Sequence, residues 1–472
     1  MSTPQANNLA ENFHAAFLAQ QETKSLNGSK SLAWLAAHRQ CAFVQFQENG
    51  FPTRRHENWK YTDVTPITKT GFVLANAEYN SAEQNPINQA ELDALRFDQK
   101  NTHELVFING QFSSEHSNIG VLANNVIIGS LRAALTDTPA LLESRLNQCI
   151  NSEDHIFAAL NTALFSDGAF VYVPDNVVIE EPIVIYFISS NSEQMLTTTP
   201  RNLIVLGKHA QANVIESFHG LKDVVSFTNT ITEIETDDGA ILEHYKVQQE
   251  NTDSFHIGGT HIKQHRNSRV ESHSISLGGA IVRNDIVTEL AGEGAEIILN
   301  GLYMGDGRQH VDNHTLVHHA KPHTRSDEYY RGVLDGHAQG VFNGKVIVHK
   351  DAQKTDAAQS NANLLLSDHA EIDTKPELEI YANDVKCSHG ATVGQLDKNM
   401  LFYIRSRGID EETAKSLLIF AFVDDVIRRI KFAPVRAQLE VSVGGRLPDA
   451  DLIKENLMSA NKIKARQIKE AV

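Results

Sequence analysis

Three runs of sequence decide the fold: AEIILNGLYM (residues 295–304), GVFNGKVIV (340–348) and AEIDTKPELEIY (370–381). Each run is short, mixes apolar with polar positions and is bounded by Gly, Asn or Asp, which is typical of strands joined by turns. Similar runs, such as IVIYFIS (183–189) and NVIESFHG (213–220), begin near residue 170. Roughly 230 residues are therefore predicted to form strands and turns without crossover helices.

A loose internal repeat supports a coiled arrangement of these strands. A small residue leads into alternating apolar and polar positions near five alanines: Ala212, Ala240, Ala295, Ala338 and Ala370. Their spacings vary from about 28 to about 55 residues, so the longer intervals could hold more than one coil of a solenoid. The pattern predicts a mainly β fold with a parallel β-helix core, and a large β-sandwich is the alternative.

The segments on either side of this core are helical in pattern. Apolar residues recur at helical spacing in several places, and we expect helices over Leu9–Gln21, Ser31–Asn49, Leu131–Ile150 and, at the end, Pro448–Ile468. The expected organisation is a mostly helical N-terminal region over residues 1–155, a β-helix core over 156–400 and a helical C-terminal region over 401–472.

One C-terminal helix is apolar on nearly every side. Asp410 is placed to cap its N-terminus, and residues 417–423 are LLIFAFV. A helix with only one buried face carries polar residues on the other face. Burial between the β-helix and the last helix would explain this segment. The segment is also interpreted as a docking helix for a partner, with Leu417, Leu418, Phe420 and Phe422 as the contact residues, and the two interpretations are compatible.

The stretch that follows residue 384 carries the candidate metal site. Cys387 is the only cysteine in the second half of the chain, and His389 lies two residues further on. In an extended chain these two side chains share a face with Val385, while Lys386 and Ser388 point the other way. A thiolate and an imidazole can bind iron or zinc, but a closed site needs about four ligands. The remaining ligands would come from elsewhere, and structural burial of the cysteine is the competing interpretation.

The bulk composition is that of a folded protein in a reducing compartment. The chain has 472 residues, of which 41% are hydrophobic and 21% are charged. Its net charge of −17 argues against binding to nucleic acid. The sequence contains neither a secretory signal nor an apolar run of about 18 residues, so no membrane span is expected. Three scattered cysteines do not form a disulfide framework, and a cytoplasmic location is expected.

Histidines are concentrated in the same part of the chain. Thirteen of the 22 lie between His256 and His389, and His310, His314 and His318 are spaced so that they share one face. A hydrogen-bonded structural role explains any one of them, whereas the group as a whole favours a transient role with iron. No phosphate-binding loop, CxxC, HExxH or GxSxG motif occurs, and we therefore predict that the chain is not an enzyme.

Longer motifs carry a family resemblance. The principal ones are HVDNHTLVHHAKPHTRSDEYYRGVLDGHAQGVFNGKVIVHKDAQKTDAAQSN (310–361), LLLSDHAEIDTKPELEIYANDVKCSHGATVG (364–394) and LFYIRSRGI (401–409). Weaker ones are RRHENWKYTDV (54–64) and FAALNTALFSDGAFVYVPDNVVIEEPI (157–183). Together they resemble the SufB/SufD family of iron–sulfur cluster assembly scaffolds. The segment DVKCSHGATVG (384–394) is most similar to the SufD branch.

The resemblance implies a right-handed parallel β-helix with helical ends and a non-catalytic scaffold function. The chain would pair with a SufB-like chain, bind a SufC-like ATPase through its C-terminal helices, and support iron entry and nascent cluster formation. Cys387 and His389 would lie at the subunit interface. The isolated chain would hold no stable cofactor, would meet iron or an iron–sulfur cluster only transiently in the complex, and could form a homodimer. The alternatives are a β-solenoid carbohydrate-active enzyme and a purely structural homo-oligomeric solenoid.

Overall fold

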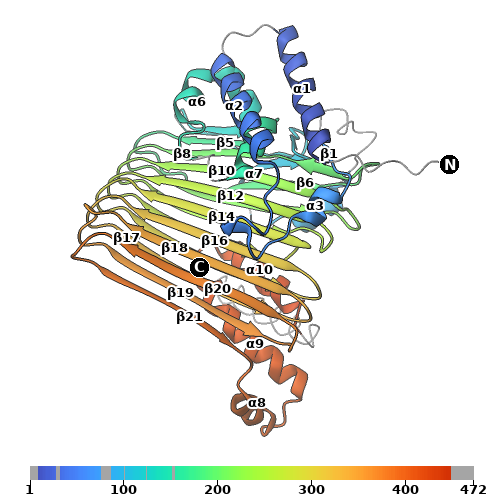
Figure 1. Cartoon of the computed structure of the whole chain (residues 1–472), viewed down its shortest axis with the longest axis vertical. Helices are drawn as coiled ribbons and strands as arrows, with labels where there is room; N and C mark the ends of the chain where they lie inside the picture. Colours follow the sequence, from blue (N-terminus) through green and yellow to red (C-terminus); the bar gives the residue numbers. More distant parts are fainter. Residues whose placement is uncertain are drawn as a thin grey trace, which may run out of the picture.

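The computed structural model is a long stack of strands with helices at both ends (Figure 1). It describes residues 9–27, 32–75, 87–99, 101–123, 125–150 and 155–447. The helix expected over Pro448–Ile468 lies outside the described residues. The stack confirms the predicted parallel β-helix core and excludes the sandwich, because successive strands alternate between two parallel sheets.

The first sheet forms one wall of the β-helix. From the last coil to the first its main strands are β20 (Glu371–Ile380), β18 (Gln339–Val348), β16 (His310–His319), β14 (Ile281–Leu290), β12 (Phe255–Gln264), β10 (Phe227–Thr236), β8 (Arg201–Leu206) and β5 (Ala169–Val173). These pair in parallel, and β4 (Ile127–Ser130) adds an antiparallel strand beyond β5. The short strands β1 (Val73–Leu74) and β7 (Leu196–Thr198) pair beside β10.

The second sheet forms the opposite wall. Its parallel strands are β21 (Lys386–Gly394), β19 (Asp356–Leu365), β17 (Arg325–Leu334), β15 (Glu296–Gly305), β13 (Arg269–Ser276), β11 (Ile241–Gln249), β9 (Gln211–Gly220), β6 (Ile183–Ser189) and β2 (His103–Ile108). The antiparallel strand β3 (Gln111–Phe112) completes it. In-register pairing stacks equivalent side chains, so Leu242, Val270 and Ile297 form an apolar column inside the β-helix.

The coils turn at equivalent positions with left-handed backbone. Residues of positive φ occur between a strand of the first sheet and the next strand of the second: His209, Gly239, Asn267, Gly294, His323 and Lys354. Neighbouring turns are hydrogen-bonded, as from Gly239 N–H to the carbonyl of Arg266. The repeat alanines Ala240 and Ala295 follow two of these turns. Because β13 lies between β11 and β15, the longer interval does contain an extra coil.

Helices of the N-terminal region cover the outside of the first sheet, except for the helix over Gln89–Leu95, which packs on the outer face of the second sheet. They are α1 (Leu9–Asn27), α2 (Ala33–Asn49), η2 (Glu57–Trp59), α3 (Thr65–Lys69), α4 (Gln89–Leu95), α5 (Leu131–Asp137), α6 (Pro139–Arg145) and α7 (Ile156–Leu164). Aromatic side chains of α1 and α2 join one buried cluster with Phe227 and Phe255 of the sheet. The helices expected near residues 9–21 and 31–49 are therefore present.

The single helix expected over Leu131–Ile150 is wrong. Two short helices, α5 and α6, meet at Thr138, which leaves the helical region with φ −135° and ψ 51°. Pro139 causes this break, because proline disfavours helical backbone in the residue before it and lacks an N–H. The second helix ends at Arg145, so Cys149 lies outside it.

The C-terminal helices α8 (Lys398–Arg405), α9 (Glu411–Ile427) and α10 (Ala433–Gly444) follow the last strand. Asp410 caps α9, since its carboxylate accepts a hydrogen bond from Thr413 N–H at 3.0 Å. Residues of α9 and α10 share a buried apolar cluster with the outer face of the second sheet. Among the described helices, none combines the length and the apolar character that crossing a bilayer requires.

Candidate functional site

The two sheets end at β20 and β21, and this end of the β-helix is open. No further coil follows them among the described residues. Side chains that a next coil would cover are consequently exposed, and Val393 on β21 retains 50% of its accessible surface. An edge strand also presents unpaired backbone N–H and C=O groups, which is a ready site for pairing with another chain.

Cys387 and His389 lie on this edge strand with their side chains on the same face. Their register partners on β19 are Ala357 and Gln359, both buried inside the β-helix. Cys387 is half-buried and, with Val385, contacts the interior core, whereas His389 is exposed. The shared face expected from the spacing is therefore confirmed, while binding of a metal by the two residues stays a prediction.

The surroundings of Cys387 favour the neutral thiol. Burial raises its pKa, the Asp356 carboxylate raises it further, and a backbone hydrogen bond from Ala357 opposes both effects. The metal ligand is the thiolate, so a metal that bound here would have to displace a proton. In the single chain this cysteine therefore has the character of a small packed side chain.

The residues predicted to dock a partner differ in exposure. Helix α9 buries Ile419 and Val423 against the second sheet. Phe420 and Phe422 pack partly against the same cluster, and Leu418 is half-buried. Of the four predicted residues only Leu417 is exposed, with 44% of its surface accessible. The apolar character of this helix is thus explained mainly by packing on the β-helix.

A more exposed apolar surface lies on α8, and this surface was not predicted from the sequence. Met400, Phe402 and Tyr403 are all exposed, and Phe402 retains 74% of its surface. Figure 1 shows this helix projecting beyond the last strands. The aromatic pair in the run LFYIRS (401–406) could have indicated this surface. Helix α8 has no buried residue, and exposed large apolar side chains are typical of a surface that a partner covers.

Histidines outside the open end have separate structural partners. On the outer face of β16, His310 contacts the Thr62 hydroxyl at 2.8 Å and His314 contacts the Asp312 carboxylate at 3.0 Å. His318, further along the strand, stacks on His349. The three histidines spaced four apart therefore share a face without forming a joint site.

One group of metal-type ligands lies on the outside of the first sheet. Glu235, Asp237 and His265 bring their ligand atoms within 4.8 Å of one another. The guanidinium of Arg145 lies 2.9 Å from Glu235 and 3.7 Å from Asp237. Because the arginine already neutralises these acids, this group is explained as an ion-pair network that attaches α6 to the sheet.

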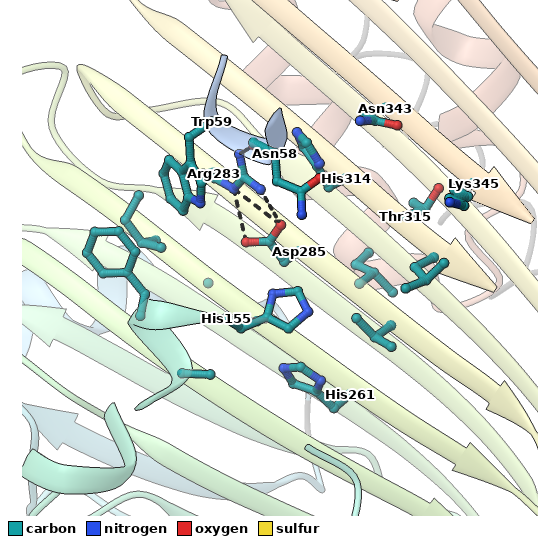
Figure 2. Close-up of a pocket in the computed structure, with 18 of the residues that line it drawn as sticks. Asn58, Trp59, His155, His261, Arg283, Asp285, His314, Thr315, Asn343 and Lys345 are labelled. Atoms are coloured by element: carbon teal, nitrogen blue, oxygen red, sulfur yellow. Dashed lines mark hydrogen bonds and ion pairs between the residues drawn. The ribbon is translucent and has the colours of Figure 1, made fainter. Parts of the chain in front are cut away.

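A pocket of about 290 Å³ lies between the outer face of the first sheet and the N-terminal segment (Figure 2). Arg283 is buried there, donates to Asp285 and Asp312, and stacks on the ring of Trp59 at 3.9 Å. Its guanidinium also donates to the carbonyl of Asn58 at 2.7 Å. These contacts attach the segment around Trp59 to the β-helix.

The structure thus defines a class: a β-solenoid with helical ends whose last coil is open and carries a cysteine and a histidine on its inner face. Comparison with known proteins shows the family to which the chain belongs. Residues 187–422 match the family described as the SufBD core domain of the SUF system for FeS cluster assembly, and residues 9–185 match the SufBD protein N-terminal region. The chain belongs to the SufBD family, and its function is in iron–sulfur cluster assembly.

The sequences of three curated relatives match most of the chain. The iron–sulfur cluster assembly protein SufD of Escherichia coli is 31% identical over 447 residues, which are 94% of this chain and 98% of that protein. A SufBD family protein of Synechocystis is 32% identical over 84% of this chain and 87% of its own length. SufD of Bacillus subtilis is 26% identical over 86% of this chain and 92% of its own length.

Proposed function

We propose that the chain is a non-catalytic scaffold subunit of a cytoplasmic SUF-type assembly complex, in which a nascent iron–sulfur cluster forms at the open end of its β-helix. The observation that carries the proposal is the uncovered inner face of β21, where Cys387 and His389 lie side by side at a sheet edge. His389 is the principal contributor to iron or cluster handling, because it is exposed and because a neutral imidazole binds a metal, whereas a cysteine must first lose its proton.

The partner at this end is a SufB-like chain. Edge pairing would cover apolar side chains such as Ile380 and Val393 and would satisfy the free backbone groups of the outermost strand. It would also supply the ligands that two residues cannot provide alone. Without that partner, two copies of this chain could pair through the same strand edges and form a homodimer.

A SufC-like ATPase is the second partner, and it docks on the C-terminal helices. The exposed surface of α8 together with Leu417 on α9 is the contact region that fits this role. The chain itself contains no phosphate-binding loop, so the energy of ATP hydrolysis would come from this partner. Iron and the cluster are transient cargo of the complex, with no cofactor held stably by the isolated chain.

The test is co-expression of this chain with a SufB-like chain and a SufC-like ATPase, followed by purification through a tag on this chain. The expected result is a complex that accepts iron and sulfide and acquires the visible absorption of an iron–sulfur cluster, while the chain alone stays colourless and without ATPase activity. A chain that purifies alone with a stable cluster and hydrolyses ATP would exclude the proposal.

A further inference from the structure

A column of inward-facing side chains ends at His389. The register pairs Glu328 on β17 with Gln359 on β19, and Gln359 with His389 on β21. The first two are buried inside the β-helix, and the third stands at its open end. Parallel neighbouring strands lie about 4.8 Å apart, so paired side chains on one face are adjacent.

Hydrogen bonds fix the orientation of Gln359, the middle residue of this column. The amide nitrogen of Gln359 donates to Oε2 of Glu328 at 3.3 Å, and the Thr315 hydroxyl donates to the same oxygen at 2.5 Å. The other end of the carboxamide, Oε1 of Gln359, is buried and has no hydrogen-bond partner among the described residues. A buried acceptor without a donor loses the hydrogen bonds that it would make to water in the unfolded chain, so a donor for it is expected.

The chain makes room for this carboxamide with a glycine. Gly344 on β18 faces the interior, and a Cβ atom at this position would lie 2.0 Å from the amide nitrogen of Gln359. Any larger residue would therefore push the carboxamide out of the column. The position of Gln359 next to the open end thus depends on three inward-facing residues: Thr315, Glu328 and Gly344.

We propose that Gln359 is a positioning residue for His389: when the exposed side chain of His389 turns toward the interior, the free carboxamide oxygen of Gln359 accepts a hydrogen bond from one of its ring nitrogens, and Glu328 holds the carboxamide in that orientation. The inference rests on the proposed function, in which His389 handles iron. Fixing the proton on one ring nitrogen leaves the other unprotonated and available to a metal.

The test is nuclear magnetic resonance of the full chain with ¹⁵N only in its histidine rings. The signals of His389 are identified by their loss in His389→Gln. We expect the wild type to show one tautomer at neutral pH, and Gln359→Leu to shift both nitrogen signals toward the averaged values of a free imidazole. The control is Asn361→Leu, which removes another buried amide of β19 whose register partner is Ala391, and it should leave the signals unchanged.

Unchanged His389 signals in Gln359→Leu would overturn the positioning role. If that variant does not fold, Gly344→Ala is used instead, because it keeps the carboxamide and displaces it, and the same shift is expected. Cluster formation on the co-expressed complex separates the two proposals. Loss of cluster in His389→Ala with normal cluster in Gln359→Leu overturns the inference alone, whereas a normal cluster in His389→Ala overturns the proposed function.

Discussion

At the level of single residues, Cys387 and His389 share a face but differ in their surroundings. The cysteine packs against the core with a raised pKa, and the histidine is exposed. Cys387→Ala therefore removes a small packed group and should lower the free energy of unfolding by about 1 kcal/mol. His389→Ala removes the imidazole to which the proposed function assigns iron, and Lys386 and Ser388, which point the other way, cannot replace it.

We predict that His389→Ala impairs cluster formation more severely than Cys387→Ala, while the complex still assembles. The measurement is complementation of a strain that lacks this gene under iron limitation, with the integrity of the complex followed by gel filtration. Full complementation by His389→Ala in an intact complex would show that the residue is structural. Failure of Cys387→Ala alone would place the chemistry on the thiol.

Glu328 predicts a pH dependence of stability. Burial raises its pKa from 4.5 to about 7, against hydrogen bonds from Thr315 and Gln359 that lower it. The folded state therefore binds the proton more tightly than the unfolded state, so this residue makes the protein lose stability as pH rises from about 4.5 to about 7. Denaturant unfolding between pH 5 and 8 should show this loss in the wild type and a smaller loss in Glu328→Gln. Identical pH slopes in both proteins would contradict the assignment.

At the level of elements, the C-terminal helices α8 and α9 differ in how far their aromatic side chains are buried. Phe402 on α8 is 74% exposed, whereas Phe422 on α9 is half-buried, with its ring 5.7 Å from the guanidinium of Arg331. The apolar run of α9 indicated either burial against the β-helix or docking of a partner; the structure shows the burial, and the exposed aromatic surface lies on α8. Substitutions on the two helices should consequently have different effects.

We predict that Phe402→Asp abolishes association with the SufC-like ATPase and leaves thermal unfolding unchanged, because the new carboxylate stays in water until a partner covers it. Phe422→Asp is the comparison variant and should lower stability by several kcal/mol, roughly, since it places an unpaired charge in a packed interface. A pull-down with the ATPase and a melting curve measure both effects. Normal ATPase binding by Phe402→Asp would remove α8 from the docking surface.

The elements show which features were predictable from the sequence. Short strands bounded by turn residues predicted the β-helix, and the i, i+2 spacing of Cys387 and His389 predicted their shared face. The break at Pro139 was also accessible, since proline ends helices by a local rule. The hydrogen bond between Gln359 and Glu328 was not, because it joins residues 31 positions apart that only the register brings together.

At the level of the whole molecule, the buried Arg283 is one of the side chains that attach the N-terminal region to the β-helix. Arg283 neutralises Asp285 and Asp312 and contacts Asn58 and Trp59. Arg283→Met would leave the buried carboxylate of Asp312 and the half-buried carboxylate of Asp285 without their arginine, and such a change costs about 3–5 kcal/mol. We expect faster proteolysis around residues 54–64 and a lower denaturation midpoint. Arg266→Met, at an exposed turn, is the control and should behave as wild type; equal effects of the two variants would contradict the role of Arg283.

Measuring the affinity for a SufB-like chain tests whether the open end of the β-helix binds a second scaffold chain. Val393 on β21 and Val178 near the first coils are matched valines, with 50% and 53% of their surfaces exposed. Neither substitution by aspartate should affect folding of the chain alone. Val393→Asp is expected to weaken binding to the SufB-like chain at least tenfold, roughly, because it buries a charge at the interface, and Val178→Asp should bind as wild type does. Equal affinity of Val393→Asp and wild type would contradict the account.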